Sequence, residues 1–133
     1  MGWYDISTKA VLYGPDGQEV ARESRIYGGP LKLFAMVRDN LLRIAGIANA
    51  RDAYGYTIRW SSNWNSDWVD VESSDPVSLD PTKMFDLGDQ VVCHVRTTKY
   101  VGVIRSIDGF EVIYMDDKGG IRQADYTLLE KNK

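Results

Sequence analysis

The chain has one cysteine, one histidine and no long hydrophobic run among its 133 residues. The single cysteine, Cys93, excludes an internal disulfide and suits a reducing compartment. A membrane-spanning helix needs about 20 consecutive apolar residues, and no such stretch is present. The first residues, MGWYDIS, have neither the basic nor the apolar part of a secretory signal. We therefore expect a cytoplasmic protein of ordinary globular composition, with no membrane partner.

Residue types that form common active sites are equally scarce. Cys93 and His94 are adjacent, and neighbouring residues on a strand point to opposite faces, which argues against a catalytic dyad. One cysteine and one histidine do not make a zinc site. The acids between Asp67 and Asp75 lack the glycine and final glutamate of a calcium loop. No glycine-rich phosphate loop is present. The sequence predicts a protein that is not an enzyme and uses no cofactor or metal.

The net charge of -3 is unevenly distributed. Residues 1–61 carry a net charge of +2 and residues 83–133 a net charge of 0. Residues 62–82 contain no base and five acids, namely Asp67, Asp70, Glu72, Asp75 and Asp80. Nucleic-acid binding needs clustered lysine and arginine, so this distribution argues against a generally basic binder.

The first 73 residues predict an α+β unit with the order ββαββ. Strand-like residues run from about 4 to 13 and from 19 to 27, and Gly14-Pro15-Asp16-Gly17 between them predicts a turn. A second hairpin is expected from the alternation over 56–60 and a returning strand over 68–72. Between the hairpins, the spacing predicts one main helix over about 30–50, packed on an antiparallel sheet.

The predicted helix has an apolar face formed by Phe34, Val37, Leu41, Ile44 and Ala48. Pro30 suits a first helical turn, where its missing N–H is not needed. Gly55 is the expected stop. Asp39 and Arg43 form an expected i,i+4 pair on another face.

After a connector over 74–83, which contains two Asp-Pro pairs, residues 84–133 show four short β runs and no helical period. Asp108-Gly109 predicts a hairpin with a type I′ turn. Short strands at this spacing predict a small β-barrel. Its interior is expected to be filled by Val101, Val103, Phe110 and Tyr114.

Two short motifs of this C-terminal part resemble the SH3-like barrel modules of the Tudor and KOW kind. Gly88-Asp89 with Val91 matches the first strand of those modules, and Gly102 with Ile104 matches the second. The resemblance implies binding of methylated side chains, proline-rich peptides, RNA or protein surfaces. An aromatic cage would draw on Tyr100, Phe110, Tyr114 and Tyr126. The same rings are alternatively core residues, because small barrels need aromatics to fill them.

The stretch WSSNWNSDWVDVE places three tryptophans at four-residue spacing among serines and acids. An aromatic residue with a polar rim is typical of a binding hot spot, although Trp64 alternatively folds back over the sheet. The acids favour a partner with a basic surface. We expect a protein-interaction module of the adaptor or inhibitor type, which binds through this loop and one barrel face. The loop candidates are Trp64, Asp67, Trp68 and Asp70.

An alternative function is that of a nucleic-acid-binding accessory protein. It would use basic residues of the helix and the barrel to neutralise phosphates. The candidates are Arg38, Arg43, Arg96, Lys99 and Arg105.

Overall fold

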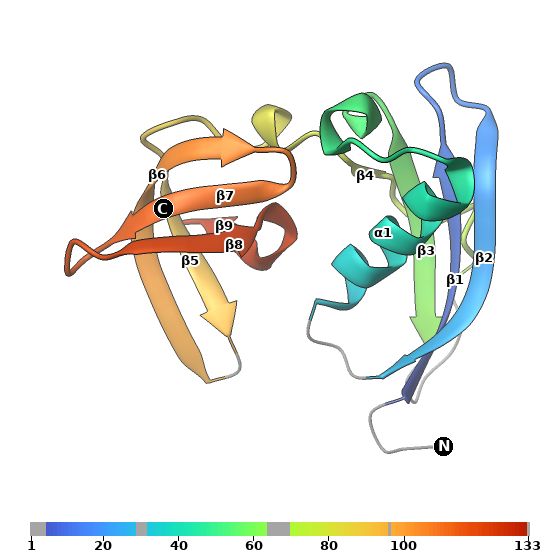
Figure 1. Cartoon of the computed structure of the whole chain (residues 1–133). Coiled ribbons are helices and arrows are strands. Elements are labelled where there is room, and N and C mark those ends of the chain that lie inside the picture. Colours follow the sequence, from blue (N-terminus) through green and yellow to red (C-terminus); the bar gives the residue numbers. More distant parts are fainter. Residues whose placement is uncertain (1–4, 29–31, 64–69, 96, 133) are drawn as a thin grey trace. The chain divides into compact units, whose positions relative to one another are not determined.

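The computed structural model describes residues 5–28, 32–63, 70–95 and 97–132. Over these residues, one α-helix and two antiparallel sheets are present, which is the α+β class that was predicted. The chain divides into two compact units, unit 1 (Met1–Leu79) and unit 2 (Asp80–Lys133) (Figure 1). This division falls inside the connector that was predicted over 74–83. None of the helices within the described ranges is long and apolar enough to cross a membrane.

The first hairpin of unit 1 is confirmed, with β1 over Asp5–Tyr13 and β2 over Glu19–Gly28. Gly17 has φ 84°, a conformation that glycine adopts at little cost. The Gly14 N–H donates to the Gln18 carbonyl at 2.8 Å and closes the turn.

The second hairpin differs from the prediction. β3 spans Thr57–Asn63 and pairs with β1, which gives the order β2-β1-β3-β4. The strand that returns is β4, Val77–Ser78, which pairs only with Thr57 and Ile58. Of the strand predicted over 68–72, residues 68 and 69 lie outside the described residues, and residues 71–74 form turns. The acidic side chains favour turns because they bond to nearby backbone, as Asp70 Oδ1 does in accepting the Glu72 N–H at 3.0 Å.

The helix is shorter than predicted, since α1 covers only Leu33–Ala45. Gly46 ends it in the left-handed conformation, with φ 78°. The Ile47 N–H donates to the Leu42 carbonyl at 2.9 Å, which is the bond of a Schellman cap. A separate 3-10 turn, η1, follows at Ala50–Ala53.

Helix α1 lies against one face of the sheet (Figure 1), and Phe34 meets Trp60 of β3 edge-to-face at 5.6 Å. Val37 and Leu41 are fully buried, as predicted. Ile44 is not part of this face, because 52% of it is exposed. The buried stripe instead includes Leu42 and Arg38, and Arg38 is only 2% exposed.

The opposite face of the sheet is covered by the segment from Asp70 to Asp75. Arg59 of β3 donates to the backbone carbonyls of Glu72 and Ser74. Arg22 of β2 approaches the Glu72 carboxylate at 3.4 Å. Val71, only 7% exposed, supplies the apolar contact of the segment. Two arginines therefore hold an irregular segment where a strand was expected.

Unit 2 contains five strands, one more than predicted. They are β5 (Gln90–Val95), β6 (Thr98–Asp108), β7 (Glu111–Asp116), β8 (Ile121–Asp125) and β9 (Leu129–Lys131). Their order is β8-β7-β6-β5-β9, all antiparallel. Two 3-10 turns complete the unit, η2 at Pro81–Lys83 and η3 at Tyr126–Leu128. Both turns begin at an aspartate whose side chain accepts a backbone N–H.

The interior of unit 2 is formed by Phe85, Val91, Cys93, Ile104, Val112, Tyr114, Tyr126 and Leu129. The prediction that Val101 and Val103 face inward is wrong: Ile104 is buried, and Val101 is 36% exposed. Residues 101–104, Val-Gly-Val-Ile, contain no polar side chain on either face of the strand. The alternation of apolar and polar residues therefore could not show which face points inward. A bulge at Arg105 then bends β6.

The β6–β7 hairpin is confirmed, but its turn type differs from the prediction. Asp108 pairs with Glu111, which leaves Gly109 and Phe110 as the two central residues. Gly109 has φ 61°, and the described non-glycine residues with positive φ do not include Phe110. This is the pattern of a type II′ turn, which needs glycine only at its first central position.

Candidate functional site

The four aromatic candidates of unit 2 do not converge on one open site. Tyr114 and Tyr126 are buried, at 2% and 0% exposure. Phe110 packs on this core, with its ring centre 6.0 Å from that of Tyr126. Tyr100 is half-buried, and its ring face is covered by the guanidinium of Arg122, 3.7 Å from the ring centre. The structure therefore places all four rings in or against the core, and Tyr100 additionally contacts a cation of the same chain.

The cation over Tyr100 is fixed by a carboxylate. Arg122 Nε donates to Asp116 Oδ2 at 2.9 Å, and Asp116 Oδ1 accepts the Gly120 and Lys118 N–H groups at 2.7 and 3.0 Å. The Gly120 bond, together with the guanidinium, lowers the pKa of Asp116. Asp116 thus closes the β7–β8 turn and orients Arg122 at the same time.

Tyr114 gives a pH dependence that can be measured. Burial, with a contribution from Cys93, raises the pKa of Tyr114 to about 12. The unfolded chain ionises near the ordinary value of about 10, so it loses its proton first as the pH rises. The stabilisation from the neutral phenol is complete below about pH 10 and is lost as the pH approaches 12.

We expect Tyr114→Phe to remove this alkaline loss of stability from unit 2. Denaturant unfolding as a function of pH, with tyrosinate absorbance as the titration signal, measures the effect. Tyr27 of unit 1, whose pKa burial also raises, remains in both proteins as an internal reference. Identical alkaline slopes for the two proteins would contradict the assignment.

Of the loop candidates, Trp64, Asp67 and Trp68 lie outside the described residues. Asp70 is exposed, and its carbonyl accepts the Ser73 hydroxyl at 2.9 Å. Beside this segment, a slot of about 450 Å³ runs along β3 and is lined by Trp60, Ser61, Ser62, Ser73, Ser74 and Asp75.

The basic candidates for nucleic-acid binding are placed differently from one another. Arg38 is buried and its guanidinium Nη2 lies 2.9 Å from Asp39 Oδ1. Arg43, which was expected to pair with Asp39, donates to Asn40 Oδ1 instead. Lys99 and Arg105 are exposed on β6, in the other unit. Arg96 lies outside the described residues.

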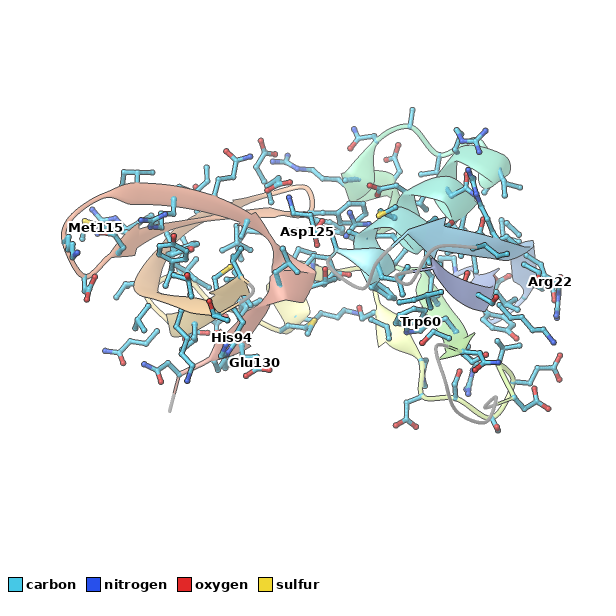
Figure 2. The ribbon with its side chains drawn as sticks, turned by 90° about the horizontal axis from the view of Figure 1, so that it is seen from below. Arg22, Trp60, His94, Met115, Asp125 and Glu130 are labelled. Carbon is cyan, nitrogen blue, oxygen red and sulfur yellow. The ribbon has the colours of Figure 1, made fainter. Side chains whose placement is uncertain are left out.

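Cys93 and His94 take opposite faces of β5. Cys93 is buried at 2% exposure, whereas His94 is exposed and its Nε2 lies 3.7 Å from Glu130 Oε2 (Figure 2). Within the described ranges, no group of three or more histidine, cysteine, aspartate or glutamate residues is arranged to hold a metal ion.

The outward face of the five-stranded sheet carries an apolar strip that the sequence reasoning missed. Strand register places Val92 beside Val101, and Val103 beside Met115, which pairs in turn with Ile121. Val101 is 36% exposed and Ile121 is 65% exposed. We define the outer strip as Val92, Val101, Val103, Ile113, Met115 and Ile121.

The outer strip runs between two charged borders along the strand direction. Beyond Ile113, the pairs Asp108–Glu111 and Glu111–Asp125 form a row of three acids, the acidic row. At the other end, His94 pairs with Lys99. Met115 of the strip and Asp125 of the acidic row are marked in Figure 2. Strands of an antiparallel sheet with one solvated face normally alternate, so that polar residues lie on the solvated face. A contiguous apolar strip on that face is therefore unusual.

Comparisons with protein-family models, curated proteins and solved structures gave no match. The similarity of residues 84–133 to SH3-like modules therefore remains a prediction.

Proposed function

We propose that this protein is a protein-interaction module of the adaptor or inhibitor type, which binds its partner through the outer strip. The observation that carries the proposal is the contiguous apolar surface on the outward face of the sheet, from Val92 on β5 to Ile121 on β8. Exposed apolar patches with a polar border are typical of binding surfaces.

The charges around the outer strip define the kind of partner. The acidic row holds Asp108, Glu111 and Asp125, and its strand pairs include no base. A partner surface with an apolar centre and a basic border is complementary to it and would be attracted over a distance. This agrees with the basic partner expected from the acidic segment 62–82.

The SH3-like architecture is the fold that we propose for residues 84–133. Five short antiparallel strands around one aliphatic and aromatic core support it. Such modules serve many purposes, so the architecture adds little to the functional argument.

The test compares three baits on a column loaded with lysate of the native host. The first is the wild-type protein, and the second is the double variant Val101→Lys, Ile121→Lys. The third is a matched control, Ile44→Lys, which changes a residue that is 52% exposed in unit 1. A captured protein is then purified, and its direct binding is measured by calorimetry.

We expect the double variant to bind at least about tenfold more weakly, because it places two charges in a desolvated contact. The control should bind like the wild type, and neutralising Asp108 and Glu111 should slow association. Equal binding by all three baits would rule out the outer strip. Light scattering that shows a dimer, broken by the double variant, would make a second copy the occupant and contradict a separate partner.

A further inference from the structure

The slot beside β3 lies along an open strand edge. β4 pairs only with Thr57 and Ile58, so in the described part of the chain the remainder of β3 has no strand on that side. Ser73, Ser74 and Asp75 form the facing wall, and the intervening space of about 450 Å³ is large enough for a small ligand group.

Ser61 of β3 contributes a buried hydroxyl to this slot. The residue is 5% exposed, and its Oγ has no hydrogen-bond partner among the described residues. Native proteins satisfy nearly all buried polar groups, because leaving one unsatisfied is destabilising. The unsatisfied Ser61 hydroxyl therefore favours a ligand that brings a polar group into the slot.

The facing wall offers acceptors. The Ser73 hydroxyl donates to the Asp70 carbonyl at 2.9 Å, and the Ser74 hydroxyl donates to the Val71 carbonyl at 2.7 Å. Each hydroxyl has thus used its proton and can take part in a further hydrogen bond only as an acceptor. The Asp75 carboxylate is an acceptor when ionised. A ligand rich in donors fits this lining.

The charges around the slot indicate which kind of hydrogen-bond donor it binds. Asp75 lines the slot, and Asp70 and Glu72 lie on the same segment. Of the nearby arginines, Arg22 is paired with Glu19 at 2.9 Å, and Arg59 donates to the backbone of the segment. We propose that the slot binds an organic cation, namely an ammonium or guanidinium group of a basic side chain or of a free polyamine.

The site is independent of the outer strip, because the two lie in different units and share no residue. Either proposal can therefore fail without the other.

Amide NMR titrations with four probes test the slot. N-acetyl-lysine amide and N-acetyl-arginine amide represent a partner's side chain, spermidine represents a free polyamine, and sorbitol is a neutral donor of similar hydrogen-bonding capacity. We expect saturable shifts at Ser61, Ser62 and Ser74 with the cations. Tighter binding of spermidine than of the amino-acid amides assigns the slot to a free polyamine, and the reverse assigns it to a side chain.

Asp75→Asn should weaken cation binding by about tenfold, because it removes the charged acceptor. Asp117→Asn is the matched control: it makes the same change at an exposed position of unit 2 and should leave binding unchanged. Ser61→Ala should weaken binding by a few-fold without lowering the thermal midpoint, since it removes a hydroxyl that has no hydrogen-bond partner in the part of the chain that the structure describes.

Three results would overturn the proposal. The first is the absence of a saturable shift with any cation. The second is an equal response in the Asp75→Asn variant. The third is stronger binding of sorbitol than of the cations.

Discussion

Gly102→Val is expected to unfold unit 2, with a loss of about 3 kcal/mol or more in its free energy of unfolding. Gly102 lies on β6, opposite Val91 and Asp116, and a β-carbon at this position would point into the interior. A β-carbon at this position would lie 2.5 Å from Tyr114 Cδ2 and still closer to the Met115 carbonyl oxygen. One neighbour is a buried ring and the other is backbone, so neither can move aside at low cost.

The loss is large relative to the stability that a unit of this size has. Small domains bury a modest fraction of their surface and are marginally stable. Gly102→Ala should show a smaller effect of the same sign, because the first added carbon already makes the contact. Amide hydrogen exchange of peptides from 80–133, together with denaturant unfolding, measures the change.

Gly28→Ala is the matched control. A β-carbon at Gly28 meets nothing within 4 Å, and the residue is not among those with positive φ. We expect its free energy of unfolding to change by less than about 0.5 kcal/mol. All four tryptophans belong to unit 1, so their emission follows that unit separately. A Gly102→Val protein with wild-type exchange protection in β5–β7 would contradict this account of the close approach.

Tyr126→Ala is expected to have the second large effect, a loss of about 3–5 kcal/mol in the unfolding free energy. The side chain is fully buried, and its ring packs against Phe110. Removing it leaves a cavity among Ile104, Leu129 and their neighbours, which the surrounding strands fill only in part. Calorimetry and hydrogen exchange of unit 2 measure the loss.

Tyr100→Ala separates a core role from an aromatic cage. Tyr100 is half-buried, packs at the border of the core and contacts the Arg122 guanidinium, so its removal should cost only about 1 kcal/mol. In an aromatic cage, Tyr100 and Tyr126 would both be important for binding, and neither would be essential for folding. Equally small losses of unfolding free energy in Tyr100→Ala and Tyr126→Ala would contradict the core assignment of Tyr126.

The local elements were predictable where the residues themselves restrict the backbone. Gly14-Pro15-Asp16-Gly17 fixed the first turn, and Gly109 fixed the turn between β6 and β7. Prediction failed where two local signals competed. The apolar period from Phe34 to Ala48 suggested a long helix, but Gly46 in the left-handed conformation ended it.

The candidate site was less predictable, since it depends on strand register. The outer strip joins residues from β5, β6, β7 and β8, which no spacing along the chain brings together. The slot joins β3 to Ser73, Ser74 and Asp75, which follow the strand predicted over 68–72 and run into the connector predicted over 74–83. No spacing along the chain brings these residues next to β3.

By itself, the sequence determined the α+β class, the β1–β2 and β6–β7 hairpins and the acidity of residues 62–82, because turn residues, apolar periods and charge act over short distances. Only the tertiary structure decided which parity of β6 faces inward. Val101 and Val103 are as apolar as Ile104, and Gly102 is the residue that fits where Tyr114 and the Met115 backbone approach most closely. That choice turned two valines outward and created the strip that we assign to a partner. The inward face of β6 is thus fixed by a steric contact with β7, and this contact exists only once the two strands have paired.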